Sequence, residues 1–298
     1  MHITLSELIS LRLFARQLAL RQPQKALRLQ TGLSASTIKG RGMDFDETRL
    51  YQPGDDVRFM DWRVMARTGK AHTKLFCEEK DRPVLIIIDQ SLSLRFGTRL
   101  TFKSILAAQL AAILAWMAYY RGERVGGIVF HDQYINCFKP QAREQSVLSL
   151  LRQVEKTNHE TPQKSTATQL ATVIEHLNYL AQPDTLVYLI SDFSALNADI
   201  SLQIKRLLAK TSVHACFISD PFEQALPARG HYPLTDLQET VILNAGNKAL
   251  SQAYQSSFTA HENQLKALFN TPKSHYAAFS TAVDIRTASR QYDSRRGY

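Results

Sequence analysis

Carboxylate and hydroxyl side chains follow two short apolar runs of the chain, residues 84–89 (VLIIID) and 185–191 (TLVYLIS). The residues of this set are Asp89, Ser91, Ser93 and Asp192, together with Thr168 at the start of a later expected helix. Alternate residues of an extended segment point to the same side, so the carboxylate and the two serine hydroxyls would face one point. Such oxygen donors favour a hard cation, Mg²⁺ above all, with Mn²⁺ as a substitute. The alternative is that these residues only cap the helices that follow the two runs.

The two apolar runs are predicted to be central strands of one sheet. Continuous β-branched runs of this length are typical of parallel strands that are buried on both faces. From residue 84 onward such strands alternate with helical patterns, which predicts a doubly wound α/β sheet, mostly parallel and Rossmann-like. Ligands of such sheets bind at the carboxyl ends of the strands, so the polar residues above would share one edge.

The remaining elements are predicted from the same alternation. Residues 126–130 and 133–138 are only two residues apart and are expected to form an antiparallel hairpin at the sheet edge. Further strands are expected at 213–218 and 275–280, a second hairpin at 231–243, and helices at about 98–121, 144–156, 168–181, 196–210 and 247–270. The uncharged stretch 104–120 falls short of the roughly 20 apolar residues that a bilayer span requires, so it is expected to be a buried helix.

The chain is expected to divide into three regions. Residues 1–83 would contain the N-terminal helices, the first of which starts with a capping box at Thr4 and Glu7, and a signature segment within residues 40–80. Residues 84–285 would form the α/β domain. Residues 286–298 lack apolar periodicity and are expected to be a disordered basic tail.

Charge and cysteine content limit the classes of function. The chain of 298 residues carries 36 Lys and Arg against 27 Asp and Glu, a net charge of +9, but the excess lies in residues 1–42 and 286–298. The neutral body offers no basic groove, so no specific nucleic acid is expected. The ends could instead contact an anionic membrane surface or RNA, for example through Arg12, Arg16, Lys25 and Arg28, or could simply aid solubility. Three distant cysteines without a CxxC pair argue for a reducing compartment, and a cytoplasmic protein is expected.

Residues 40–80 combine acidic and arginine side chains around a turn at Pro53. The spaced positions are Arg49, Tyr51, Gly54, Asp55, Asp56, Arg58, Asp61, Trp62 and Ala66 through Glu79. The three aspartates are expected to pair with Arg49, Arg58 and Arg63, and Trp62 is expected to anchor the segment to the sheet. The network would either stabilise the fold or form a docking surface for a partner.

This spacing resembles the signature of the family called domain of unknown function 58, over about residues 30–285. Members of that family are typically encoded beside MoxR-type AAA+ ATPases. The resemblance therefore implies an adaptor that works with such an ATPase in the maturation or assembly of a client protein. Many members carry amino-terminal membrane helices, and none is expected in this sequence.

The strand-end residues resemble the metal-ion-dependent adhesion site of von Willebrand factor type A domains. Asp89, Ser91 and Ser93 match its DxSxS loop, Thr168 its threonine and Asp192 its later aspartate. The resemblance implies that the three hydroxyl residues bind the ion more directly, that the aspartates act partly through water, and that a partner's carboxylate fills the open position. The sequence departs from the family pattern at Ala167, where a glycine is common, and at Phe193, which replaces the usual glycine.

Enzyme motifs are poorly matched. The segment closest to a phosphate-binding loop, residues 97–104, has Phe102 where a glycine must approach the phosphate, and no GxSxG elbow is present. The strongest enzymatic alternative is a Mg²⁺-dependent nuclease with Asp55 or Asp61 ahead of Glu78 and Lys80. A non-catalytic binding protein is therefore the main expectation.

Overall fold

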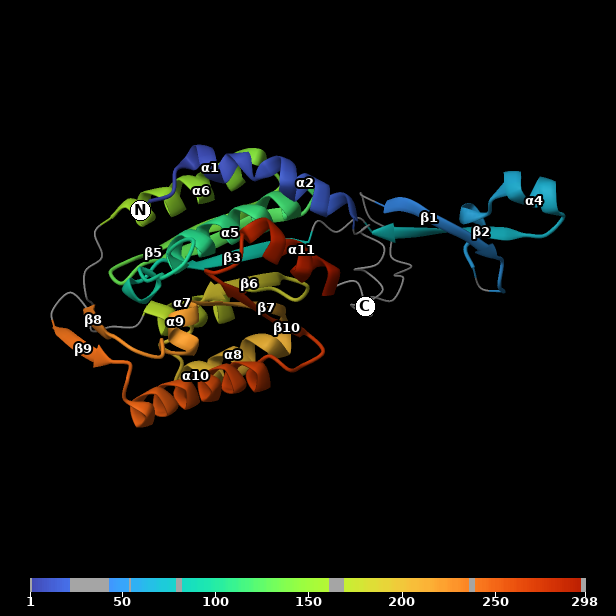
Figure 1. Ribbon diagram of the computed structural model, residues 1–298. Coiled ribbons are helices and arrows are strands. Elements are labelled where there is room, and N and C mark those ends of the chain that lie inside the picture. Colours follow the sequence, from blue (N-terminus) through green and yellow to red (C-terminus); the bar gives the residue numbers. More distant parts are fainter. Residues whose placement is uncertain are drawn as a thin grey trace. The chain divides into compact units, whose positions relative to one another are not determined.

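The chain folds into two compact units, one built from residues 1–22 with 82–298 and the other from residues 23–81. The computed structural model describes residues 2–21, 43–53, 55–78, 82–160, 169–235 and 239–295. Helices and strands carry the labels of Figure 1.

The larger unit is built on a six-stranded sheet with the order β10-β7-β6-β3-β4-β5 (Figure 1). Its strands are β3 (Pro83–Asp89), β4 (Arg124–Phe130), β5 (Ile135–Gln141), β6 (Leu186–Ser191), β7 (Ser212–Ser219) and β10 (Ser274–Ser280). All neighbours pair in parallel except β4 and β5, which form the expected antiparallel edge hairpin. The chain runs outward from β3 in one direction through β4 and in the other through β6. The predicted doubly wound α/β sheet is therefore confirmed, and its switch point lies between β3 and β6.

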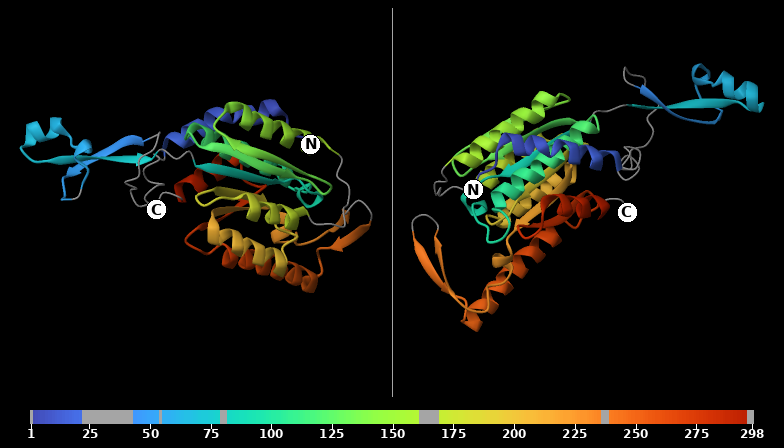
Figure 2. Two further views of the ribbon diagram at one scale, coloured as in Figure 1. Left: turned by 180° about the vertical axis from the view of Figure 1, so that it is seen from behind. Right: turned by 45° about the horizontal axis from the view of Figure 1, so that its top comes forward.

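Helices cover both faces of this sheet (Figure 2). One face carries α1 (Leu5–Ser10), α2 (Arg12–Arg21), α5 (Lys103–Tyr120), α6 (Glu144–His159) and α11 (Ile285–Arg295). The other face carries α7 (Gln169–Leu180), α8 (Ala198–Lys210) and α10 (Lys248–Leu268). Strand β3 supplies both cores, because Ile86 and Ile88 point to the first face while Leu85 and Ile87 point to the second.

Helix α5 is the central helix of the first face. Its side chains are buried from Lys103 to Ala118 except Gln109, so it has no solvent-facing stripe. It begins five residues later than the sequence pattern predicts, because residues 97–102 form the loop that leads into it. Within the described residues, no helix combines the length and apolar character needed to cross a membrane.

Smaller elements follow two of the strands in the described part of the larger unit. The 3-10 helix η2 (Leu92–Leu94) follows β3. The short helix α9 (Pro221–Gln224) follows β7, and the antiparallel hairpin of β8 (His231–Thr235) and β9 (Thr240–Asn244) follows it. Phe222 of α9 stacks edge-on against Tyr232 of the hairpin, with ring centres 5.2 Å apart. The hairpin expected at 231–243 is confirmed.

The smaller unit is a two-stranded antiparallel sheet with two short helices between its strands. Strand β1 (Met43–Leu50) pairs with β2 (His72–Glu78), and the connection contains η1 (Val57–Phe59) and α4 (Trp62–Thr68). Gly69 ends α4 at a φ of 70°, a left-handed conformation that glycine adopts without strain.

The expected disordered tail is wrong for residues 286–295, which belong to α11. Ile285, Ala288 and Tyr292 lie three and four residues apart and pack against the first core, where Tyr292 is 5% exposed. The Tyr292 hydroxyl also lies 2.6 Å from Nδ1 of His214. Because basic residues lie between these positions, the apolar stripe of α11 is not apparent in the sequence.

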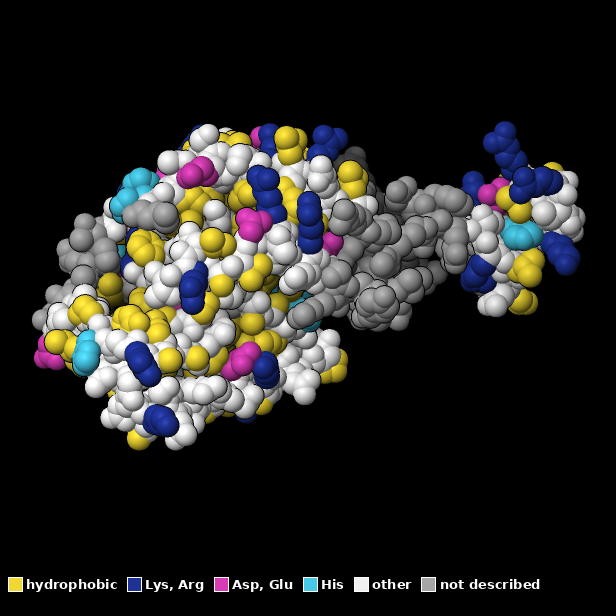
Figure 3. All heavy atoms as spheres, in the orientation of Figure 1, with side chains coloured by type: hydrophobic (Ala, Val, Ile, Leu, Met, Phe, Trp, Pro, Cys, Tyr) yellow, Lys and Arg dark blue, Asp and Glu magenta, His cyan; other side chains and the backbone are white. Residues whose placement is uncertain are grey.

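The division expected after residue 83 is also wrong, because α1 and α2 pack on α5 and belong to the larger unit. The guanidinium of Arg12 donates to the Tyr120 hydroxyl and to both carboxylate oxygens of Glu144, and it lies over the Trp116 ring. The Arg12 guanidinium is therefore held against α5 and α6 while 37% of its side chain stays exposed, and the membrane or RNA contact considered for it stays a prediction. Lys25 and Arg28 lie outside the described residues. On the face of the larger unit seen in Figure 3, Lys and Arg side chains are scattered and do not form one patch.

Candidate metal-binding site at the carboxyl ends of β3 and β6

The switch point brings the predicted strand-end residues together. Asp89 is the last residue of β3, and Asp192 directly follows β6, whose Ile190 pairs with Ile88. Both carboxylates are buried, with 4% and 6% of their residue surface exposed. The Ser91 and Ser93 hydroxyls lie 3.2 Å apart, and the Ser93 hydroxyl is close enough to Asp192 to lower the pKa of that carboxyl. Four of the five predicted residues therefore converge, while Thr168 lies outside the described residues.

Asp89 is held by one backbone and one side-chain hydrogen bond. Its Oδ1 accepts from the backbone N–H of Ser91 at 2.9 Å, and its Oδ2 accepts from the Ser191 hydroxyl at 2.6 Å. Burial, and then repulsion from Asp192, raise the pKa of Asp89 to about 7 against these hydrogen bonds. Asp89 is therefore only partly ionised at neutral pH.

Asp192 is paired with a buried lysine that sequence reasoning did not single out. Nζ of Lys103, the first residue of α5, lies 2.8 Å from Oδ2 of Asp192 and 2.6 Å from Oε1 of Glu223. Burial alone would raise the pKa of Asp192, but the ammonium holds it below its usual range. Burial opposes the charge of Lys103, yet the two carboxylates raise its pKa to about 12.

Signals for both missed residues are present in the sequence. Lys103 is the one charged residue of an otherwise uncharged helix. Glu223 belongs to a capping box with Asp220 directly after β7, so the rule applied to β3 and β6 would also have found it at this third strand end.

The donor set fits a hard divalent cation. When ionised, Asp89, Asp192 and Glu223 carry three negative charges against the single positive charge of Lys103. The two negative charges left unbalanced equal in size the charge of one Mg²⁺ or Mn²⁺ ion. Oxygen is also the donor atom that such ions prefer. The described residues contain no group of three or more His, Cys, Asp or Glu side chains placed to hold a metal. A cation here would therefore depend on the serine hydroxyls and on water.

The loop that carries Ser91 and Ser93 is fixed by contacts with neighbouring strand ends. The backbone N–H of Leu92 donates to Oδ2 of Asp132 at 2.8 Å, and the Gln90 side chain bridges the Ser104 carbonyl and the Asn158 amide. The Arg95 guanidinium donates to backbone carbonyls at the end of α6. These bonds hold the two hydroxyls in place before any ligand binds.

His131, directly after β4, is a further strand-end residue. No sequence pattern separates it from an ordinary core histidine. It is 2% exposed and stacks on Tyr134, but neither ring nitrogen has a hydrogen-bond partner among the described residues. Burial lowers its pKa, which favours the neutral imidazole.

We expect His131→Phe to leave the free energy of unfolding unchanged or to raise it by about 1 kcal/mol. The phenyl ring keeps the stacking on Tyr134 and removes two buried polar atoms that lack partners, a defect that costs about 1–3 kcal/mol. Urea denaturation of the variant and the parent protein measures the change. A loss of more than about 1 kcal/mol would show that the imidazole has a partner beyond the described residues.

The signature segment forms a looser network than predicted. Arg49 pairs with Asp55 at 2.7 Å, but Arg58 and Asp56 are 4.0 Å apart and exposed. Asp61 accepts from the backbone N–H groups of residues 63 and 64 as the N-cap of α4, and its charged neighbour is Lys74 at 3.9 Å instead of the expected Arg63 side chain.

Trp62 does not pack on the β1–β2 sheet of its own unit, because 61% of its surface is exposed. Its expected anchoring to the larger sheet stays a prediction. Helix α4 turns Val64 and Met65 inward, and residues 62 and 66 share the outward side at helical spacing. Tyr51 is half-buried, while Gly54, the Glu78 side chain and Lys80 lie outside the described residues. The ligand set considered for a nuclease therefore lies partly outside the described residues, and that alternative stays a prediction.

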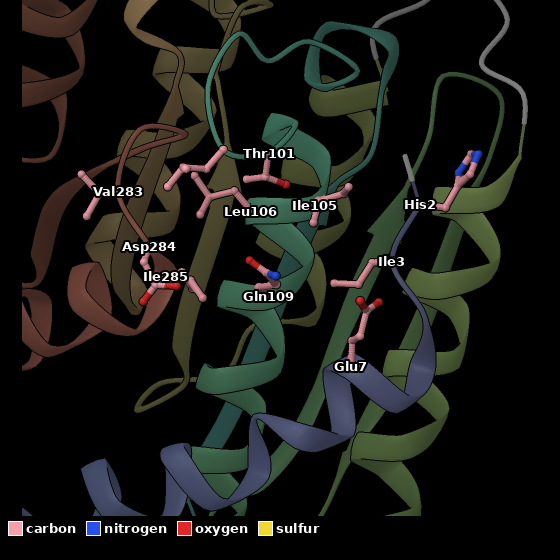
Figure 4. Close-up of a pocket in the computed structure, with 11 residues that line it drawn as sticks. His2, Ile3, Glu7, Thr101, Ile105, Leu106, Gln109, Val283, Asp284 and Ile285 are labelled. Carbon is pink, nitrogen blue, oxygen red and sulfur yellow. The ribbon is translucent and has the colours of Figure 1, made fainter.

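A separate cavity of about 290 Å³ lies between α1, α5 and the segment leading into α11 (Figure 4). Polar side chains from all three elements line it, including Glu7, Gln109 and Asp284. None of the strand-end residues lines this cavity. The candidate cation site is therefore distinct from this cavity.

Solved structures similar to this chain share low sequence identity with it. They include the hypothetical protein BatB of Bacteroides thetaiotaomicron, with a TM-score of 0.45 and 14% identity over 72% of this chain and 98% of that one. They also include von Willebrand factor type A from Catenulispora acidiphila, with a TM-score of 0.40 and 14% identity over 76% and 44% of the two chains. The SpRpn10 VWA domain gives a TM-score of 0.37 and 11% identity over 71% and 95%. Von Willebrand A domains are thus among the similar structures.

Sequence relatives and a family model identify the chain more directly. The uncharacterized protein Rv1480 of Mycobacterium tuberculosis is 29% identical over 247 residues, which cover 83% of this chain and 77% of that protein. The uncharacterized protein Mb1516 of Mycobacterium bovis matches equally well. The family model described as "protein of unknown function DUF58" matches residues 47–264 of this chain. Because this match covers more than half of the chain, the protein belongs to the DUF58 family.

Proposed function

We propose that this protein is a non-catalytic adaptor that binds a partner protein through the strand-end site, with Mg²⁺ or Mn²⁺ as the bridging ion. The observation that carries the proposal is the convergence of Asp89, Ser91, Ser93 and Asp192 at the switch point, with an excess of negative charge once Asp89 is ionised. A bound cation would supply an open coordination position for a carboxylate of the partner.

The residues of the site have separate tasks in this proposal. The Ser91 and Ser93 hydroxyls are the donors for the ion, and Asp89 orients their loop through the Ser91 backbone N–H. Asp192 supplies charge close to the Ser93 hydroxyl. The hydroxyls face each other and a carboxylate that Lys103 already balances, an arrangement of ligands and not of a nucleophile with its base.

The partner proposed is a MoxR-type AAA+ ATPase or a client protein that presents an acidic side chain. Family resemblance supports the ATPase, and the positive charge of a bound cation favours the acidic group. Neither Cys137 nor Cys216 forms a disulfide within the described residues, which supports a reducing, cytoplasmic setting.

We expect Ser91→Ala with Ser93→Ala to weaken Mn²⁺ binding at least tenfold in calorimetry, because the two hydroxyl donors are lost. Ser201→Ala, on α8, removes a hydroxyl that donates to the Asn197 carbonyl of its own helix, so it is the control and should bind Mn²⁺ like the parent protein. Equal affinities of the double variant and the parent would place the ion elsewhere or exclude it.

Partner binding is tested by titrating the ATPase against chelator and salt. A metal-bridged contact should be abolished by EDTA and should tolerate a several-fold rise in salt. A contact made by exposed basic residues should show the opposite behaviour, because salt screens surface charge. If the ATPase binds as tightly in EDTA as without it, the contact is not bridged by a metal ion, and the metal-bridged version of the adaptor is overturned.

A further inference from the structure

Lys103 is an unusual residue for its position. It is 1% exposed, and it begins a helix that contains no other charged residue. Burying an ammonium costs several kcal/mol unless carboxylates balance it at hydrogen-bond distance. The two short contacts to Asp192 and Glu223 provide this balance.

The ammonium lies against the same carboxylate that the proposed cation would use. Oδ2 of Asp192 faces Nζ of Lys103, while Oδ1 accepts the backbone N–H of Ser194 at 3.0 Å. A divalent ion at the serine hydroxyls would therefore share Asp192 with an ammonium. Two cations on one carboxylate repel each other, and the repulsion is strong in a buried site.

We infer that Lys103 is a built-in counter-cation that weakens metal binding at this site and, once a metal is bound, favours an acidic ligand. The inference rests on the proposed metal site. With Lys103 present, the three carboxylates and a divalent ion sum to zero charge, so a partner's carboxylate meets a neutral site. Without Lys103 the loaded site keeps one negative charge, which repels that carboxylate. Lys103 thus lowers the affinity of the site for the ion and raises the affinity of the metal-loaded site for the acidic partner.

Glu223 permits a charge-matched test. Lys103→Met removes one positive charge, Glu223→Gln removes one negative charge and keeps a polar side chain of the same size, and the double variant restores the net charge of the parent site. If charge is the cause, Mn²⁺ affinity should rise in the order Glu223→Gln, then the parent and the double variant together, then Lys103→Met. Each step should be about tenfold, as expected for one charge in a partly desolvated site.

The experiment is calorimetric titration of Mn²⁺ into the four full-length proteins, with near-ultraviolet circular dichroism to check folding. Where Lys103→Met does not fold, the other two variants still test the order. If the parent binds no Mn²⁺ but Lys103→Met does, the counter-cation role holds and the metal-dependent adaptor fails. If the parent and all folded variants bind with equal affinity, the adaptor's metal site stands and the role of Lys103 is overturned. Absence of binding in every variant overturns both.

The second arm uses a hexaglutamate peptide as the acidic probe in saturating Mn²⁺. Lys103→Met should bind the peptide at least tenfold more weakly than the parent, and the double variant should recover the parent's affinity. Tighter peptide binding by Lys103→Met would overturn the inferred preference for an acidic ligand.

Discussion

Asp220→Ala is expected to lower the free energy of unfolding by about 4 kcal/mol at pH 7, because one fully buried carboxylate joins three separate segments. Asp220 follows β7 and accepts hydrogen bonds from the backbone N–H of Thr98 at 2.8 Å and from the Thr98 hydroxyl at 2.5 Å. It also accepts from the Thr281 hydroxyl after β10 and from the backbone N–H of Phe222. Alanine would leave these donors buried without an acceptor.

The contribution of Asp220 to the free energy of unfolding should depend on pH. Burial alone would raise its pKa, but the hydrogen bonds from Thr281 and Thr98 hold it below the usual value. A carboxyl group whose pKa is lower in the folded state stabilises the fold above its unfolded pKa of about 4, and this contribution disappears as the pH falls through the folded pKa. Urea denaturation at pH 7 and in acid should show the gap between Asp220→Ala and the parent narrowing in acid.

Asp220→Asn is the matched control for this prediction. It keeps an oxygen acceptor and the size of the side chain but removes the charge, so it should lose less stability at pH 7 than Asp220→Ala. A cost below about 1 kcal/mol for Asp220→Ala would show that the three segments are held together by other contacts.

The second large effect is expected at Gly127→Ala, with a loss of about 3 kcal/mol or more, or failure to fold. A Cβ atom at Gly127 of β4 would lie 2.1 Å from the backbone oxygen of Ile86 in β3. Both strands are fixed in the middle of the sheet, so neither backbone can move aside cheaply.

Gly246→Ala serves as the comparison for Gly127→Ala. A Cβ atom there would meet only the Asn244 side chain, at 3.3 Å, and that side chain can shift. Thermal unfolding should therefore separate the two variants by roughly 10 °C or more. Similar melting temperatures would mean that β3 and β4 separate more readily than their hydrogen-bonded pairing implies.

Local sequence patterns predicted the sheet and most of the candidate site. The β-branched runs that became β3 and β6 are buried on both faces, so their period and composition identify them without knowledge of the rest of the chain. Since Asp89 ends β3 and Asp192 directly follows β6, the rule for parallel sheets was enough to bring them together.

Other features could not be read from local patterns. The ion pair between Lys103 and Glu223 joins residues 120 positions apart, so no local spacing reveals it. Trp62 was expected to anchor its segment, but within its own unit it is 61% exposed, because a two-stranded sheet offers too small a face to cover every aromatic side chain. Arg12 looked like a surface charge until the aromatic rings beneath it were placed.

The pairing of Met43 with Glu78 has a consequence for how the chain folds. Helix α2 and strand β3 belong to one unit but are separated in sequence by the whole smaller unit, so their association must close a long loop. The entropic cost of closing a loop, expressed as free energy, falls by about 0.6 kcal/mol each time the loop length is halved. The β1–β2 hairpin brings Met43 and Glu78 side by side. Its prior formation therefore shortens the loop between α2 and β3 by the whole length of the hairpin. Early folding of the smaller unit should therefore accelerate the docking of α1 and α2 on α5.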